Sequence, residues 1–298
     1  MNNNNSNGWF FLDKPIGMTS NFALQKIRRI FNNSKAGFVG TLDPLASGFL
    51  PIALGKATKI IPLIEKSDKR YIFTVKWGIK TETGDSEGKI IKKCGKYPKK
   101  VDIVNALSEF CGNIEQFPHK YSSVKINGQR AHKLARKNMK FQLKKRQIKV
   151  NNFTLINNIS ETLASFFVDC SAGTYVRSLA ESLGDSLGTL ATVVELRRIG
   201  FNNFNKKLIS LDYLLSLVHS DELKRLVHPI DAVMNNVSKI QLDDNQVKKV
   251  VSGSFVLMNK HLVKKKKNSL VFAKHEDRYI ALGLIKDCTF HPKKLLTS

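Results

Sequence analysis

A single carboxylate, that of Asp43, lies in a segment whose other residues can hold it in place. Residues 37–49 read GFVGTLDPLASGF, so glycines that permit tight turns flank the acid, and Pro44 fixes the next backbone angle. No other Asp or Glu occurs between Asp13 and Glu65, although Lys and Arg are frequent there. A lone acid on a constrained loop of a cationic chain predicts a nucleophile or base that acts on a polyanion. The alternative, from these residues alone, is an Asp-Pro turn in which Asp43 only caps a turn or a helix.

Other familiar chemistries lack the residues that they need. The stretch from Gly48 to Lys56 is spaced too widely for a phosphate-binding loop, and Ala57 follows its lysine. The sequence contains neither H-E-x-x-H nor G-x-S-x-G, and its histidines are scattered. We therefore expect no metal ion and no cofactor. Glycosidases that use no metal rely on a pair of carboxylates, but a nucleobase can delocalise its own charge as it leaves. One Asp could therefore break an N-glycosidic bond in RNA.

Four other side chains are candidates to complete such a site. Arg177 follows Gly-Thr-Tyr at the start of an expected helix, and a guanidinium there would keep Asp43 ionised in a dry pocket. Its alternative is a solvated helix arginine. Tyr71 and Tyr121 could stack on a base that is extruded from RNA, although pattern alone favours ordinary core packing for Tyr71. Leu196 is, from the residues alone, a strand hydrophobe.

Hydrophobic periodicity predicts the elements that position these residues. Residues 8–13 form a short buried strand, and Ser20 is expected to be the N-cap of a helix that continues to Phe31. Residues 70–79 alternate as a strand, with Tyr71 on the apolar face. Further helices are expected over 56–63, 101–111, 174–187 and after Ser210, and further strands over 148–156, 162–170 and 191–200. Because helices and strands mix without a βαβ repeat, we expect an α+β domain with a mixed β-sheet.

A second, smaller unit is expected after His228 and Pro229. Short strands are predicted over 254–258, 269–273 and 279–285, around the lysine run from Lys264 to Lys267. These elements are typical of a small β-rich module. The sequence thus divides at about residue 228 into a larger domain and this module.

Composition points to a polyanionic partner. The chain of 298 residues has room for about two domains, and 49 Lys+Arg against 24 Asp+Glu give a formal net charge of +25. Such an excess attracts phosphate, although compositional drift accounts for some of the lysines. The four cysteines form no C-x-x-C pair, which favours a reducing compartment. With no signal peptide and no apolar run long enough for a membrane span, we expect a cytoplasmic protein that does not enter membranes.

Five blocks of the sequence resemble the TruB family of bacterial tRNA pseudouridine-55 synthases. The block around Asp43, GTLDPLASG at 40–48, is similar to the catalytic signature of that family. Four other blocks agree in order and spacing. The first is LDKP at 12–15 with GMTS at 17–20, and the second is DKRY at 68–71. The third is PHKYSSVK at 118–125, followed by Gly128 and Arg130-Ala131. The fourth is GTYVRSL at 173–179, which continues to LRR at 196–198. The resemblance covers residues 8–205.

The resemblance implies a particular reaction and a set of roles. It implies that uridine 55 in the T-loop of tRNA is flipped out and isomerised to pseudouridine, without metal or cofactor. Asp43 would be the catalytic aspartate, Tyr71 would stack on the base and serve in proton transfer, and Arg177 would pair with Asp43. Leu196 would help to wall the pocket. Attack at C1′ of the ribose and attack at C6 of the base both stay open.

The same resemblance implies how RNA is bound. Phe38 stands where the family often has a histidine that contacts the T-loop, so stacking is retained there but not a hydrogen bond. Residues 120–149 are similar to a segment that closes on the T-arm. Its candidate contacts are Tyr121, Lys125, Arg130, Arg136 and Arg146. Residues 1–227 would form the pseudouridine-synthase-like catalytic domain, and residues 228–298 a PUA-like RNA-binding module.

The expected partner is therefore the T-arm of tRNA. We expect a monomer with no obligate protein partner, and assistance of tRNA folding is a second expected role. Two other functions are weighed against this one. The first is an RNA chaperone in which isomerisation is secondary or lost, and the presence of Asp43, Tyr71 and Arg177 argues against it. The second is a relative that acts on RNA-guided targets, which the short C-terminal module and the lack of long tails disfavour.

Overall fold

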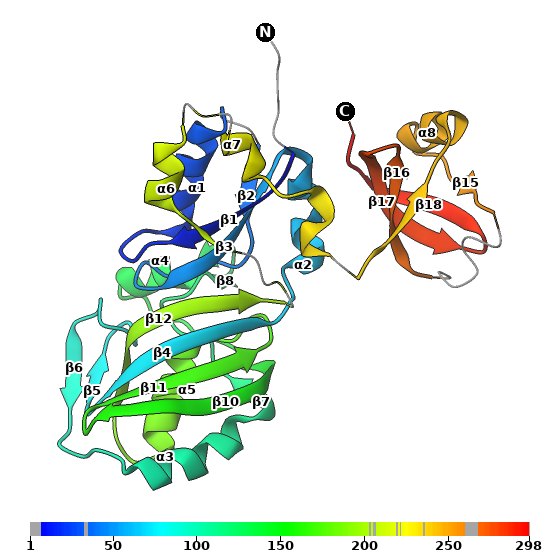
Figure 1. The fold of residues 1–298 in the computed structure, drawn as a ribbon. Coiled ribbons are helices and arrows are strands. Elements are labelled where there is room, and N and C mark those ends of the chain that lie inside the picture. The colour runs from blue at the N-terminus through cyan, green and yellow to red at the C-terminus, as the bar shows by residue number, and fades with distance from the viewer. Residues whose placement is uncertain are drawn as a thin grey trace.

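The computed structural model describes residues 7–32, 35–202, 204, 207–218, 220, 222–234, 236–259 and 268–297. These residues form a nine-stranded mixed sheet and a separate five-stranded sheet (Figure 1). The strands of the large sheet are β1 (Gly8–Lys14), β2 (Ala36–Phe38), β3 (Ser47–Leu54), β4 (Lys69–Trp77), β7 (Gly112–Gln116), β10 (Arg146–Ser160), β11 (Leu163–Cys170), β12 (Ala191–Phe201) and β13 (Ile209–Ser210). Their order is β13-β1-β3-β12-β4-β11-β10-β7, and β2 pairs with β3. The expected α+β architecture with a mixed sheet is confirmed.

The centre of the large sheet brings distant parts of the sequence together. Strand β12 is antiparallel to β4 and parallel to β3. Its parallel pairing places Arg197 and Arg198 beside Ser47 and Gly48, the first residues of β3. The loop that carries Asp43 leads directly into β3, so this pairing fixes the end of that loop against β12.

Helices pack against different strands of this sheet. Helix α5 (Val176–Ser186) packs along β12, and α3 (Lys100–Leu107) packs along β10 (Figure 1). Near β1 and β3 lie α1 (Ser20–Ile30) and α6 (Leu211–Ser216). Shorter helices are η1 (Gly55–Ile60), α2 (Ile61–Ile64), η2 (Ser108–Phe110), α7 (Glu222–Arg225) and η3 (Ile230–Val233).

The capping of α1 differs from the prediction by one residue. The side chain of Thr19, not that of Ser20, accepts the capping hydrogen bond from the backbone N–H of Phe22 at 3.1 Å. Ser20 lies inside the helix, where its hydroxyl donates to the carbonyl of Leu42 at 2.9 Å and accepts from the N–H of Leu42 at 2.8 Å. Because Thr19 can cap equally well, Ser20 is free to tie α1 to the residue before Asp43. The prediction for Ser210 is confirmed, since its hydroxyl accepts from the N–H of Tyr213.

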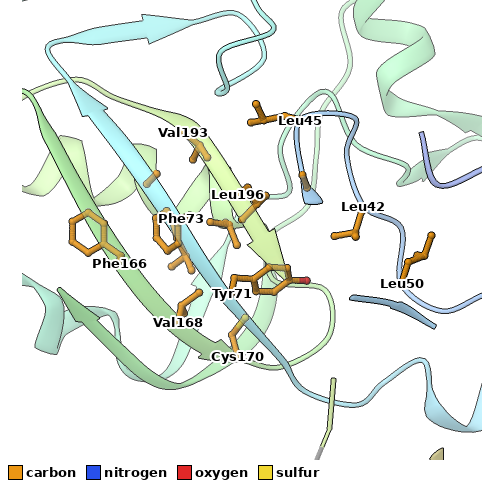
Figure 2. Packing of buried hydrophobic residues seen from close by; sticks show 14 of the residues in the cluster. Leu42, Leu45, Leu50, Tyr71, Phe73, Phe166, Val168, Cys170, Val193 and Leu196 are labelled. Carbon is orange, nitrogen blue, oxygen red and sulfur yellow. The ribbon is translucent and has the colours of Figure 1, made fainter. Parts of the chain in front are cut away.

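The apolar face of β4 forms the centre of the main hydrophobic cluster. Tyr71, Phe73, Val75 and Trp77 alternate along this strand and are all buried, as the period of two requires. Figure 2 shows Phe73 beside Phe166 of β11, with Tyr71 at the end nearer to the Asp43 loop. Tyr71 is therefore the member of this apolar row that lies closest to the Asp43 loop.

Three small elements carry the basic segment after β7. They are β8 (Lys125–Ile126), β9 (Gln129–Arg130) and α4 (Ala131–Arg136). The hairpin between β8 and β9 turns at Asn127 and Gly128, both with positive φ angles (48° and 81°). An Asn-Gly pair is the usual choice for such a two-residue turn. A second hairpin, β5 (Ile79–Thr81) and β6 (Ile90–Lys93), brackets the turn-rich stretch 82–89.

The C-terminal sheet has the order β14-β16-β17-β18-β15. Its elements are β14 (Ser238–Gln241), α8 (Asp244–Val251), β15 (Val256–Leu257), β16 (Leu270–His275), β17 (Arg278–Lys286) and β18 (Thr289–Leu295). The three predicted strands are present, although the first shortens to the two residues of β15, and β14, α8 and β18 were not predicted. Buried Phe272 and Leu282 join a cluster that also contains Trp9, so the two sheets share a hydrophobic contact. The lysine run lies outside the described residues.

Candidate active site

The carboxylate of Asp43 and the guanidinium of Arg177 form an ion pair. Asp43 Oδ2 lies 2.9 Å from Arg177 Nη2. Asp43 lies in the loop between β2 and β3, and Arg177 lies in the first turn of α5. The Asp43 side chain is 37% exposed, whereas that of Arg177 is 5% exposed. The carboxylate therefore faces the open side of the pair, and the arginine supports it from within the protein.

Arg177 also holds a second carboxylate, that of Asp85. Arg177 Nη1 lies 3.2 Å from Asp85 Oδ2 and donates to the carbonyl of Thr83 at 2.8 Å, while Nη2 donates to the carbonyl of Tyr121 at 3.0 Å. The planar fork of an arginine can satisfy such divergent acceptors at once. The Asp85 side chain is 3% exposed, so its charge depends on Arg177 for compensation.

Sequence reasoning missed Asp85. It treated residues 81–88 as a polar loop and gave none of their side chains a role. The available signal was an acid between the glycines Gly84 and Gly88, in a stretch too short to be a helix. That signal is weak, because only the fold brings this turn to Arg177.

The electrostatics of the pair set the ionisation of Asp43. Burial raises the pKa of the Asp43 carboxyl above its ordinary value, and Asp85 adds to this rise, whereas Arg177 opposes it. A carboxylate with a raised pKa binds its proton more readily and is a stronger base than an ordinary aspartate. The pair thus consists of a partly exposed carboxylate with a raised pKa and a buried arginine that compensates its charge.

Arg198 ties the two ends of the Asp43 loop to the sheet. Its side chain is fully buried, and it donates to the carbonyls of Phe49 at 2.6 Å, Gly40 at 3.0 Å and Val39 at 3.3 Å. Burial lowers the pKa of the Arg198 guanidinium, and Tyr71 opposes that shift. A buried arginine that satisfies loop carbonyls in this way fixes the loop on both sides of Asp43.

The glycines of this loop are needed where Arg198 passes. Gly40 has a φ of +67°, and a Cβ there would lie 2.9 Å from Arg198 Nη1. Gly48 has a φ of +95°, and a Cβ there would lie 2.3 Å from the carbonyl oxygen of Arg198. Both positions therefore need the left-handed backbone and the absence of a side chain.

Tyr71 lies opposite Arg198 across strands β4 and β12. It is 8% exposed, and Figure 2 shows its hydroxyl directed toward the loop that carries Leu42. Burial raises the pKa of the Tyr71 hydroxyl, and Arg198 opposes the rise through charge and a hydrogen bond. The hydroxyl thus keeps its proton at neutral pH and can donate a hydrogen bond.

Leu196 lies next to Tyr71 in the same apolar wall. It pairs with Phe73 across β12 and β4 and is 7% exposed. Leu42 and Leu45, on either side of Asp43, are also buried (Figure 2). Buried apolar side chains therefore lie on both sides of Asp43 in its own loop and belong to the same hydrophobic cluster as Tyr71 and Leu196.

Lys14 is a second positioning residue that sequence reasoning did not single out. Its ammonium donates to the carbonyls of Met18 at 2.6 Å, Pro15 at 2.8 Å and Pro44 at 3.4 Å. Burial lowers its pKa to about 8. Because Pro44 directly follows Asp43, this lysine fixes the Asp43 loop just after the carboxylate.

Comparisons with known proteins give the family. One family model, TruB family pseudouridylate synthase (N terminal domain), matches residues 28–176, and another, tRNA pseudouridylate synthase B C-terminal domain, matches residues 177–235. The tRNA pseudouridine synthase B of Clostridium kluyveri is 38% identical over 95% of this chain and 97% of its own length. This chain belongs to the TruB family. The protein of the same name from Bartonella henselae is 37% identical over 97% of this chain and 96% of its own length.

Solved structures show that the TruB-family fold extends to more distant proteins. A structure described as an H/ACA RNP bound to a substrate RNA containing 2′-deoxyuridine matches with a TM-score of 0.72 and 23% identity, over 99% of this chain and 86% of that one. A Cbf5-Nop10-Gar1 complex matches with a TM-score of 0.72 and 26% identity, over 98% of this chain and 85% of that one. Both likenesses cover the mixed sheet and the C-terminal β-rich module.

The RNA-contact residues predicted for this TruB-family chain lie on different elements. Lys125 and Arg130 pair across the β8–β9 hairpin, and both side chains are exposed, as is Arg136 at the end of α4. Arg146 is also exposed, but it lies at the start of β10, paired with Gln116 of β7. The structure therefore groups the first three on one small unit and places Arg146 at the sheet.

The two predicted aromatic contacts are less exposed. Phe38 is half-buried at the end of β2 and packs against the main hydrophobic cluster. The hydroxyl of Tyr121 donates to the carboxylate of Glu82. Burial and this hydrogen bond raise the pKa of the Tyr121 hydroxyl to about 12. Tyr121 also provides the backbone carbonyl that Arg177 uses. In this structure Tyr121 thus joins the basic segment to the active site, and stacking on a base stays a prediction for both residues.

No helix among the described residues is long and apolar enough to cross a membrane. The same residues contain no group of three or more His, Cys, Asp or Glu side chains arranged to hold a metal ion.

The coupling of the two carboxylates predicts a shift in pH dependence. With Asp43 as the expected catalytic carboxylate, we predict that activity needs its ionised form and that kcat falls as the pH drops through the raised pKa of this residue. Asp85→Asn removes a negative charge and leaves Arg177 to Asp43 alone, and both changes lower the pKa of Asp43. We expect the acidic limb of the kcat profile to move to lower pH, with a kcat about tenfold smaller because the guanidinium is no longer held on both sides. An acidic limb that stays in place, measured from pH 5 to 8 by tritium release from tRNA with labelled uridine, would contradict this coupling.

Proposed function

We propose that this chain isomerises uridine 55 in the T-loop of tRNA to pseudouridine, with Asp43 as the catalytic carboxylate. The observation that carries the proposal is the ion pair of Asp43 and Arg177, in which Oδ2 lies 2.9 Å from Nη2. The carboxylate is partly exposed, the arginine is buried, and both lie at the edge of an apolar wall. The named relatives are tRNA pseudouridine synthase B proteins, similar over nearly the whole chain. The net charge of +25 fits an RNA substrate.

The reaction rearranges bonds within one nucleoside. The bond between C1′ and N1 breaks, a bond between C1′ and C5 forms, the proton on C5 leaves and N1 gains a proton. Asp43 is the group that attacks or assists at the nucleoside, at either C1′ of the ribose or C6 of the base. Arg177 keeps the carboxylate oriented and offsets its charge. The apolar wall of Leu196 and Leu45 excludes water and retains the freed base for recapture through C5.

Tyr71 is proposed to support the flipped base. Its ring ends the aromatic row of β4, so a base that enters beside Asp43 meets an aromatic face. Its raised pKa keeps the hydroxyl protonated at neutral pH. Tyr71 therefore takes part in proton transfer as a proton donor or relay, and not as a base that is already deprotonated before the reaction.

Binding energy for base flipping would come from the basic surface. Extruding a nucleotide costs a few kcal/mol, and less where a loop is already unstacked. We propose that residues 120–149 contact phosphates of the T-arm through Lys125, Arg130, Arg136 and Arg146. We also propose that residues 1–227 are the catalytic domain and residues 228–298 a PUA-like RNA-binding module. A single chain that binds a tRNA through both of these parts would also assist tRNA folding, without a protein partner.

The position of the modified uridine can be tested directly. The purified protein is incubated with an unmodified tRNA transcript and with the same transcript carrying cytidine in place of uridine 55, and pseudouridine is mapped along both. We expect one modified position in the first RNA and none in the second. Pseudouridine at another position of the second transcript would show that the substrate site is different.

Removal of one hydroxyl tests the role of Tyr71. Tyr71→Phe keeps the aromatic face and the packing of β4 but removes the group beside Arg198. We expect kcat to fall by about 10²-fold or more, with the Kd for tRNA within about threefold of the wild type. Tyr97→Phe is the matched control and should retain its kcat, because Tyr97 packs against Gly78, beyond the end of β4 that is farther from Tyr71. A Tyr71→Phe protein that turns over at the wild-type rate would leave stacking as the only role of this residue.

A further inference from the structure

His119 is a buried histidine beside the ion-pair network to which no role has been assigned. It lies in the segment between β7 and β8, and its side chain is 5% exposed. Its Nδ1 accepts a hydrogen bond from the backbone N–H of Tyr121 at 3.2 Å, and its Nε2 lies 3.9 Å from Glu181 Oε1. Because Nδ1 is the acceptor, the neutral ring carries its proton on Nε2, directed at Glu181.

Glu181 connects this histidine to the helix of Arg177. It lies four residues after Arg177 on α5, so the two side chains share one face of the helix. Glu181 is also 3.8 Å from Lys80 Nζ. Burial alone would raise the pKa of Glu181, but the neighbouring imidazole of His119 and the charge of Lys80 lower it below its ordinary value. Glu181 is thus a carboxylate at neutral pH.

The ring of His119 also touches the turn that contains Asp85. A Cβ on Gly84 would lie 2.8 Å from His119 Nε2 and 3.4 Å from Arg177 Cβ, so the turn, the ring and the arginine are in direct contact there. This turn supplies the carbonyl of Thr83 and the carboxylate of Asp85 to Arg177. His119 therefore contacts the turn that provides these two acceptors, and it fixes the backbone of Tyr121, which provides a third.

We propose that His119 and Glu181 are a pair of positioning residues that hold the guanidinium of Arg177, and through it the carboxylate of Asp43, in the reactive orientation. Neither residue needs to touch RNA. The inference rests on the proposed function, because it assigns Arg177 to the chemistry, but it concerns the internal geometry of the protein. The pair borders a cavity of about 400 Å³, so changes in these side chains have room and need not disturb the core.

Three variants of His119 separate its two contacts. His119→Asn keeps an acceptor for the Tyr121 N–H, His119→Gln keeps a donor that can reach Glu181, and His119→Leu keeps the volume with neither contact. We expect kcat at saturating tRNA to fall about tenfold in His119→Leu, with partial recovery in each amide variant and a tRNA Kd within about twofold of the wild type. Glu181→Gln should show the same kcat and the same Kd for tRNA as His119→Gln. The double variant His119→Leu, Glu181→Gln should be no slower than His119→Leu, because the two residues act as one unit.

Two results would overturn the pair. One is a double variant whose loss is the product of the single losses, and the other is a loss in tRNA affinity that matches the loss in kcat. A crystal structure of His119→Leu gives a readout that needs no activity, since the Arg177 guanidinium should move away from the Tyr121 carbonyl. An Arg177 that keeps all its contacts there would also refute the proposal. A wild-type protein that is inactive on tRNA, with Arg177 displaced in His119→Leu, would defeat the proposed function alone.

Discussion

Replacement of Asp43 by Asn is expected to abolish pseudouridine formation while the protein still binds tRNA. The amide has nearly the shape of the carboxylate, so the loop held by Arg198, Lys14 and Ser20 should keep its conformation. The amide can neither attack a carbon as a carboxylate does nor take up a proton at neutral pH. We expect kcat to fall by at least about 10⁴-fold, as when a nucleophile is removed from other enzymes.

Tritium release under single-turnover conditions measures this loss, and filter binding measures the affinity for tRNA. The Kd should stay within about tenfold of the wild type, since phosphate contacts dominate RNA affinity. Asp13→Asn is the matched control, because Asp13 forms a similar pair (2.7 Å) with Arg197, whose side chain is 45% exposed, whereas that of Arg177 is 5% exposed. Its kcat should be within about threefold of the wild type. Turnover by Asp43→Asn at more than a few per cent of the wild-type rate would remove Asp43 from the essential groups.

The same variant separates catalysis from RNA folding. If the chain assists tRNA folding through its basic surface, Asp43→Asn should do so as well as the wild type does. A strain that lacks the protein and shows a tRNA-folding defect would then be rescued by both proteins.

Arg177→Lys is expected to have the second largest effect. A lysine keeps one positive charge, but it cannot reach two carboxylates and two carbonyls with a single ammonium. The buried Asp85 and the carbonyls of Thr83 and Tyr121 would lose donors, which also costs a few kcal/mol of folding free energy. We expect kcat to fall by about 10²- to 10³-fold and the Tm to decrease, with the tRNA Kd changed by less than about fivefold.

The control for Arg177→Lys is Arg197→Lys, in an arginine that is 45% exposed and paired with Asp13. It should retain its kcat and its Tm, because exposed ion pairs contribute little. If Arg177→Lys weakened tRNA binding strongly while kcat at saturation stayed normal, Arg177 would bind RNA and not support Asp43.

The sequence predicts those parts of the fold in which local pattern and burial agree. Strand β4 buries an apolar side chain at every second position from Tyr71 to Trp77, and α5 begins within two residues of its expected start. Strand β3 was missed, because SGFLPIAL is apolar throughout and Pro51 argues against a strand interior. Pro51 lies just beyond the β2–β3 pairs, which end at Phe38 and Ile52, so its missing N–H interrupts no pair of that ladder, and its carbonyl accepts from the N–H of Val39 at 3.0 Å.

The C-terminal module shows a similar limit. Strand β18 reads TFHPKKL, in which a proline and two lysines hide the pattern of a strand. Pro292 lies at a register shift opposite Gly283, where a missing N–H does little harm. A Cβ on Gly283 would be 2.2 Å from the carbonyl oxygen of His291, so the close approach of the two strands depends on that glycine.

At the site, sequence reasoning identifies residues but not their supports. Asp43 and Arg177 are recognisable from motif blocks, and the structure brings them into contact. Asp85 lies outside those blocks, and Arg198 and His119 lie inside them without a predicted role, because the importance of all three depends on the turn, strand and segment that folding brings to Arg177 and to the Asp43 loop. Positioning residues of this kind act through tertiary geometry, which neither composition nor spacing encodes.

A crystal structure of the Asp43→Asn protein with a T-arm stem-loop would test the central claim most directly. The account predicts that uridine 55 is flipped out of the loop, stacked on Tyr71, with its C1′ or C6 about 3–3.5 Å from the substituted side chain. A uridine that stays stacked in the loop, or that binds away from residue 43, would contradict it.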